Sequence, residues 1–319
     1  FVSHIMLWVV VVAGVLVGVS VIGGLGTWAY IRYTVKRYHA GKPSIWYSSF
    51  RPFQSTQPTD INLPVDVGSV FQRSYIEHNP SIRAEDTPII KILSINIEMG
   101  KKLSQIIDLL HDIQPDIVLL QEVDVCTRRN GNIDSVAEMA SSLSMDSVFI
   151  PQTIFAQGCD GNAILSKFPI IDAKGMYLSC QRKPKHKYKI HYGCSAVLQS
   201  PWGLIGCCSI HIDTHCGVTG RIKQYRELLP QMHEQQQKHQ LRYQIIGGDF
   251  NTLCHGLTRL LPYCSPDWKS SMGTIGHTEA EWFQKNAVEA FNEEFELDYY
   301  DPFDKKKDTT VAMLRGSYA

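Results

Sequence analysis

The sequence has no excess of charge of either sign, because 31 Lys and Arg residues balance 31 Asp and Glu residues over 319 positions. A protein with balanced charge has no overall field that attracts nucleic acid or an anionic surface. The sequence also shows no internal repeat and no long low-complexity tract. Its hydrophobic fraction of 44% is ordinary for a globular protein with a sizeable core. Any site for an anionic substrate must therefore be built locally.

The sequence also lacks the paired cysteine spacing of a disulfide scaffold. Its 9 cysteines are an odd number, and a chain of this length does not need disulfides to stabilise a core. Cys207, Cys208, His211, His215 and Cys216 could suggest a zinc site, which needs four converging ligands. Adjacent residues of a strand point to opposite faces, however, so Cys207 and Cys208 cannot converge. We interpret the cysteines mostly as reduced core residues, which favours a cytosolic face.

No charged side chain occurs between Ile5 and Ile31, a run rich in Val, Leu, Ile and Gly. A membrane-spanning helix needs about 20 apolar residues, whereas the apolar region of a signal peptide has roughly 7–15. We therefore predict a single transmembrane helix with its basic flank over residues 1–37, in which residues 5–31 contact the membrane. The positive-inside rule places the following domain in the cytoplasm, because three basic residues come directly after the apolar run: Arg32, Lys36 and Arg37.

The next segment, residues 38–87, contains five prolines and scattered polar residues. Prolines at this density rule out a long helix. We interpret the segment as a linker or a partly ordered arm that joins the membrane to a domain over residues 88–319.

Short apolar runs and helical repeats mix in this domain without strict alternation, which predicts a layered α/β sandwich. Helical spacing of apolar residues predicts a helix over 103–113 that ends before Pro115. A second helix is expected over 220–237, where Pro230 should bend or interrupt it, and a third over 279–295. The sequence at 200–203 predicts a hairpin turn. Strands are expected over 89–97, 116–121, 148–150, 163–165, 196–198, 204–212 and 243–246.

Polar side chains stand where several of these strands end, and strand ends can meet on one rim of a sandwich. They are Asn96, Glu98, Glu122, His211, Asp213, Asp249 and Asn251. Carboxylate and amide oxygens are the ligands that Mg²⁺ prefers, and such an ion neutralises charge on phosphoryl oxygens. A nearby Asp can activate water, and His or Asn can donate to an oxyanion. The inventory suits hydrolysis of a phosphoester.

Five motifs stand in order over roughly 160 residues. They are Ile92-Leu93-Ser94-Ile95-Asn96, Leu119-Leu120-Gln121-Glu122-Val123, Gly161-Asn162-Ala163-Ile164-Leu165-Ser166, Ser209-Ile210-His211-Ile212 and Gly248-Asp249-Phe250-Asn251. In this order the motifs resemble those of the endonuclease/exonuclease/phosphatase superfamily. This superfamily includes pancreatic-type deoxyribonuclease, abasic-site endonucleases, neutral sphingomyelinases and inositol polyphosphate phosphatases. The resemblance implies a four-layered α/β sandwich of two packed β-sheets flanked by helices.

The resemblance also implies roles for individual residues. Glu122 would be the main ligand of Mg²⁺ or Mn²⁺, with Asn96 close by and Glu98 as a further acidic ligand. His211 would contact the scissile phosphate. Asp249 would activate the attacking water, and Asn251 would orient phosphate and metal.

Three further residues are candidates for binding the substrate. Asn162 belongs to one of the five motifs. Arg128 and Arg129 follow the Glu122 strand closely and could reach a substrate phosphate.

The sequence departs from the superfamily at its end. The superfamily closes with an Asp-containing strand and a Ser-Asp-His motif, whose His is needed for activity, and no Asp-His dipeptide occurs in this sequence. We expect truncation by about 40 residues, judged by the length of the missing strand, loop and strand. We also expect the fragment to be inactive or nearly so.

The expected substrate is a phosphodiester, in a phospholipid or in nucleic acid. A membrane anchor brings the site near lipid and favours a sphingomyelinase-like role. A nuclease fits the same motifs, although balanced charge argues for weak binding of nucleic acid. Inositol phosphatases usually continue Gly-Asp with Leu-Asn-Tyr-Arg, which this sequence lacks. If the full protein lacks the closing His, it is instead a catalytically inactive, membrane-anchored binding or scaffold module on the same fold.

Overall fold

A computed structural model describes residues 66–76, 89–155, 158–179, 191–213, 216, 218–251, 284–295, 297–300 and 302. The predicted transmembrane helix over residues 1–37 lies outside these residues. Within the described ranges, no helix combines the length and hydropathy needed to cross a membrane.

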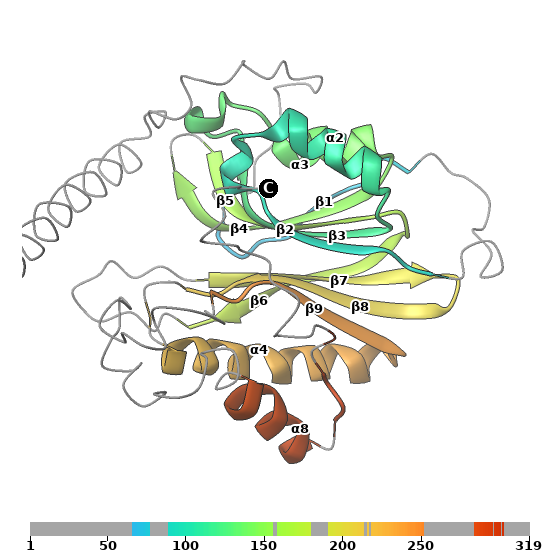
Figure 1. The fold of residues 1–319 in the computed structure, drawn as a ribbon, viewed down its shortest axis with the longest axis vertical. Coiled ribbons are helices and arrows are strands. Elements are labelled where there is room, and N and C mark those ends of the chain that lie inside the picture. The colour runs from blue at the N-terminus through green and yellow to red at the C-terminus, as the bar shows by residue number, and fades with distance from the viewer. Residues whose placement is uncertain are drawn as a thin grey trace, which may run out of the picture.

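The described residues form the predicted four layers, with two packed sheets between helices (Figure 1). The first sheet has the order β1-β4-β5-β3-β2 and the second the order β6-β7-β8-β9. Pairs β2–β3 and β8–β9 are parallel, and the other pairs are antiparallel. The strands are β1 Phe71–Arg73, β2 Ile92–Asn96, β3 Ile117–Val125, β4 Asp146–Phe155, β5 Gly158–Ser166, β6 Ile170–Leu178, β7 His191–Ser200, β8 Gly203–His211 and β9 Tyr243–Asp249.

Helices cover the outer face of each sheet (Figure 1). Helices α2 and α3 lie on the first sheet, and α4 lies on the second, with α8 on the side of α4 that faces away from the strands. Short 3₁₀ turns, η2 and η3, follow β2 and β3, and a π-helical segment, η6, precedes α8. The helices are η2 Glu98–Gly100, α2 Leu103–Ile113, η3 Arg128–Asn130, α3 Ser135–Ser142, α4 Val218–His239, η6 Gln284–Glu289 and α8 Ala290–Phe295.

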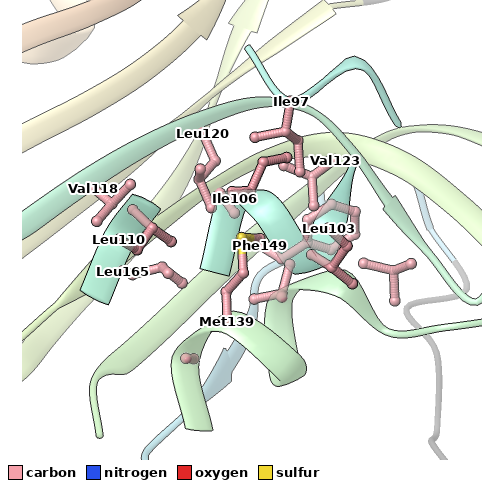
Figure 2. Packing of buried hydrophobic residues seen from close by; sticks show 14 of the residues in the cluster. Ile97, Leu103, Ile106, Leu110, Val118, Leu120, Val123, Met139, Phe149 and Leu165 are labelled. Carbon is pink, nitrogen blue, oxygen red and sulfur yellow. The ribbon is translucent and has the colours of Figure 1, made fainter. Parts of the chain in front are cut away.

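Three apolar clusters separate the four layers. Figure 2 shows the first, in which Leu103, Ile106 and Leu110 of α2 pack against Leu120 of β3. The second lies between the two sheets and includes Cys207, whereas the third lies under α4 and includes Cys208. The expectation that these adjacent cysteines face opposite sides of their strand is confirmed, which argues against a shared zinc ion.

Two local predictions are confirmed in detail. Helix α2 spans the predicted residues and ends at Gln114, whose φ of 52° is left-handed and stops the helix before Pro115. Strands β7 and β8 are joined by the predicted turn, because Ser200 pairs with Gly203.

Helix α4 continues through Pro230, so of the two effects expected of this proline the interruption does not occur. A proline inside a helix removes one hydrogen bond and costs about 3 kcal/mol. Leu228, Leu229 and Met232 flank this proline and are fully buried against the second sheet. Their burial offsets the cost of the proline, and only the folded sheet provides it.

The arm predicted over residues 38–87 contains an ordered strand. Within it, β1 pairs with β4, and the Arg73 guanidinium lies 2.8 Å from the Asp134 carboxylate. The Gln72 amide donates to the Ile170 carbonyl at 2.9 Å. The end of the arm therefore packs on the domain, as a partly ordered arm would.

Candidate active site

Both parallel strand pairs bring predicted site residues to the same rim of the sandwich. Asn96 ends β2 and pairs with Gln121 of β3, next to Glu122. His211 ends β8 and pairs with Asp249, which ends β9. Parallel strands carry the residues that follow them to one edge of a sheet. Each sheet thus contributes polar side chains, and the two sets face each other where the sheets pack.

A direct hydrogen bond joins the two sets. The Asn96 side-chain amide donates to Asp249 Oδ2 at 3.1 Å, across 153 residues of sequence. His211 Nε2 lies 3.9 Å from the same oxygen. The side chains of His211 and Asp249 are 18% and 33% exposed, so a substrate can reach them. The predicted convergence of these three residues is present in the fold.

Asn251 holds the loop that follows Asp249. Its main-chain N–H donates to Asp249 Oδ1 at 2.9 Å, and its side-chain amide donates to the Ile212 carbonyl at 2.7 Å. The Ile212 N–H in turn donates to the Asp249 carbonyl at 2.9 Å. These bonds fix the Asp249 carboxylate at the rim and place Asn251 beside it.

Gly248 is required by the close approach of β8 and β9. Its φ is 148°, and a Cβ at this position would lie 1.9 Å from the Ile210 carbonyl oxygen. No side chain fits there, so the glycine before Asp249 is dictated by backbone contact.

Glu122 sits in a β-bulge. Leu120 pairs with Ala163 and Val123 pairs with Gly161, so two residues of β3, Gln121 and Glu122, oppose Asn162 of β5. Glu122 has a φ of 52° and is half-buried. A left-handed glutamate inside a strand is uncommon, and such strain collects at functional sites. The bulge redirects the Glu122 side chain relative to the regular alternation of β3.

Asn162 lies beside this bulge but is fully buried. Its amide donates to the Tyr192 carbonyl at 2.9 Å, so it also links β5 to β7. Its Oδ1 accepts no hydrogen bond from the residues that the structure describes.

Glu98 lies next to Asn96 but directs its carboxylate to Lys101. Its main-chain N–H donates to Asn96 Oδ1 at 3.0 Å. Its side chain is 63% exposed and pairs with the Lys101 ammonium. Its backbone orients the Asn96 amide, while its exposed carboxylate is paired with Lys101.

The two arginines differ sharply. Arg128 is exposed. Arg129 is buried and forms an ion pair with the buried Asp124, with Asp160 at 3.9 Å. Burial raises the pKa of Asp124 to about 6, against the opposing effect of Arg129. This position gives Arg129 a structural role that its sequence spacing did not indicate.

The oxygen donors on the rim have the chemistry of a hard-cation site. Among the residues that the structure describes, no three His, Cys, Asp or Glu side chains are grouped closely enough to hold a metal ion. Mg²⁺, however, is often held by one or two carboxylates, substrate phosphate and several waters. Glu122 and Asp249 with the Asn96 amide fit that donor set.

The sequence model of the endonuclease/exonuclease/phosphatase family matches residues 93–293. This chain belongs to that family. The match covers every strand of both sheets except β1 and the first residue of β2, and it includes all nine predicted site residues. The comparison with curated proteins gave no match.

Several solved structures resemble the chain at low identity. An endonuclease/exonuclease/phosphatase from Beutenbergia cavernae is 15% identical, with a TM-score of 0.41, and 57% of this chain covers 52% of that one. The catalytic domain of human nocturnin with bound sulfate is 20% identical, with a TM-score of 0.41, and the match covers 55% of this chain and 69% of the nocturnin chain. A mannosyl-6-phosphatase from Bacteroides thetaiotaomicron is 17% identical, with a TM-score of 0.41, and the match covers 58% of this chain and 72% of the phosphatase chain. The chain thus spans about half the length of the first of these structures.

Proposed function

We propose that this protein is a metal-dependent phosphoesterase that hydrolyses a phosphodiester. The observation that carries the proposal is the contact of Asn96 and His211 with one carboxylate, that of Asp249. The Asp249 carboxylate, which is the proposed base, thus lies beside the His211 ring, which is the proposed phosphate ligand, and beside the Asn96 amide. The side chains of His211 and Asp249 are partly exposed. Membership of the family supports phosphoester cleavage as the chemistry.

In this proposal residues of the first sheet bind the metal ion, and residues of the second sheet activate water and contact the phosphate. Glu122, with Asn96 and with Glu98 after rotation, would hold Mg²⁺ or Mn²⁺. The bound ion would neutralise charge on the phosphoryl oxygens. Asp249, held by Asn96 and Asn251, orients and deprotonates the attacking water. His211 donates to a phosphate oxygen.

The exposed Arg128 is the proposed contact to a second phosphate or to a headgroup. Asn162 lies beside the Glu122 bulge, and its carbonyl oxygen has no hydrogen-bond partner among the described residues. It would accept a hydrogen bond from the substrate after a local shift. The anchor over residues 5–31 would hold the site near a membrane and favour a lipid phosphodiester over nucleic acid. Balanced charge supports the same preference.

Turnover of bis-p-nitrophenyl phosphate by the full-length protein tests the proposal. We expect hydrolysis with Mg²⁺ or Mn²⁺ and none in chelator; equal turnover in chelator would refute the metal's role. Glu122→Gln should abolish this turnover and leave the melting temperature nearly unchanged. Glu234→Gln is the matched control and should keep the turnover, because Glu234 is an exposed carboxylate, 3.7 Å from Lys174. A folded protein without turnover under any metal would favour the scaffold alternative.

The substrate class is tested by a panel of sphingomyelin, phosphoinositides, abasic DNA and RNA, each with and without Mg²⁺. We expect the highest kcat/KM on a lipid. A higher value on either nucleic acid would reassign the substrate while leaving the phosphoesterase proposal intact.

A further inference from the structure

The proposed site is divided between two sheets that are held together mainly by apolar packing. Asn96 and Glu122 come from the first sheet, and His211 and Asp249 come from the second. Apolar contacts are non-directional, so they do not by themselves fix how one sheet is placed along the other. A site that needs sub-ångström placement requires directional contacts between the sheets.

A buried polar pair supplies such contacts. The Gln121 side-chain amide donates to Ser209 Oγ at 2.9 Å and to the Leu119 carbonyl at 3.1 Å. Ser209 Oγ in turn donates to the Leu120 carbonyl at 2.9 Å. Gln121 is 1% exposed and Ser209 is fully buried. We call this pair the inter-sheet tie.

The tie lies directly behind both halves of the site. Gln121 precedes Glu122 at the bulge, and Ser209 stands two residues before His211 on β8. Gln121 also pairs with Asn96, and its carbonyl accepts from the Ile97 N–H at 3.0 Å. One residue therefore holds the end of β2 through its main chain and holds β8 through its side chain.

We propose that Gln121 and Ser209 are positioning residues, which set the spacing between the Glu122 half and the His211–Asp249 half of the site. The inference rests on the proposed function and deepens it. Neither side chain needs to touch substrate. Their hydrogen bonds keep the strained bulge and the end of β8 in a fixed relation, as outer residues do around a metal ligand.

The test separates positioning from simple stabilisation. Replacing both partners of a buried hydrogen bond by apolar groups of similar shape is nearly neutral for stability, whereas removing one partner is costly. The double variant Gln121→Met/Ser209→Ala should therefore melt near the wild-type temperature. We expect its kcat to fall about 10- to 100-fold, with little change in KM.

The structure offers a matched control of the same residue types. Ser195 Oγ donates to Gln235 Oε1 at 2.8 Å and joins β7 to α4, and both residues are buried. The control Ser195→Ala/Gln235→Met should keep kcat within about twofold of wild type. If the tie variant also keeps its kcat, the positioning role is wrong and the phosphoesterase proposal stands.

Two further measurements keep the inference testable. If the double variant fails to fold, Ser209→Ala alone should still lower kcat about tenfold, and an unchanged kcat would overturn the role. If the wild-type protein shows no turnover, the proposed function fails by itself. Mn²⁺ affinity from titration calorimetry then decides: weaker binding in the tie variant than in the control supports the inference, and equal or absent binding refutes it.

Discussion

The buried ion pair between Arg129 and Asp124 predicts that the two neighbouring arginines affect different properties. Arg129 is 4% exposed and Asp124 is fully buried. Removing one partner of a buried pair leaves an uncompensated charge and typically costs about 3–5 kcal/mol. Arg129→Met should therefore lower the free energy of unfolding by about that amount. Arg128→Met, at an exposed position, should change it by less than about 0.5 kcal/mol and raise KM instead.

The pKa of Asp124 makes the effect of Arg129→Met dependent on pH. Burial raises this pKa from 3.8 to about 6 in the folded protein, a difference worth about 3 kcal/mol. Because the pKa of Asp124 is higher in the folded protein than in the unfolded chain, protonation of Asp124 favours the folded state. This contribution to the free energy of unfolding is complete below pH 3.8 and is lost as the pH rises through about 6. Loss of Arg129 raises the pKa further, so the variant binds a proton above pH 6 that wild type has released. The cost of the substitution should thus grow between pH 5 and pH 8.

Urea unfolding at several pH values, together with KM for bis-p-nitrophenyl phosphate, measures both properties. The reasoning is refuted if Arg129→Met has the same free energy of unfolding as wild type at every pH and raises KM as much as Arg128→Met does. Arg129 would then be a substrate contact, as its place in the sequence suggested.

Three other changes test separate features of the fold. Gly248→Ala should destabilise the protein by about 1–3 kcal/mol or more in thermal unfolding, because the added Cβ meets the Ile210 carbonyl; an unchanged melting temperature would contradict the close approach. Glu122→Gly should abolish turnover yet raise the free energy of unfolding by up to about 1 kcal/mol, because glycine tolerates a left-handed φ; a large loss of stability would make Glu122 structural. Deleting residues 1–37 should release the protein from sedimented membranes, and continued sedimentation with them would overturn the anchor.

The layers and the rim could be predicted because they depend on local patterns. Apolar runs ending in Asn96, His211 and Asp249 predicted strands whose ends carry the site, and helical spacing predicted α2 to the residue. The bulge at Glu122 could not be predicted, because it appears only when β3 pairs with β5 and two residues oppose Asn162.

Other features depend on partners that are distant in sequence. Phe71–Arg73 looks like part of a proline-rich arm until β4 provides an edge for pairing. From its place in the sequence, Arg129 is a candidate phosphate ligand. In the fold it forms an ion pair with Asp124, a polar residue inside an apolar strand. The polar residues inside apolar runs, among them Asp124, Gln121 and Ser209, were the available signal, and each is buried with a partner.

Cys207 and Cys208 point to opposite faces of the second sheet, so their thiols are covered by different layers of the fold. The reactivity of each thiol therefore shows whether its own covering layer has moved away. Burial raises the pKa of Cys207 to about 12 and that of Cys208 higher still, so neither forms the thiolate that alkylating reagents attack. Each sulfur becomes reactive only when the layer covering it moves away. Alkylation of Cys207 therefore records separation of the two sheets, and alkylation of Cys208 records departure of α4. Fragment masses that distinguish the two adjacent sites would show which layer leaves first.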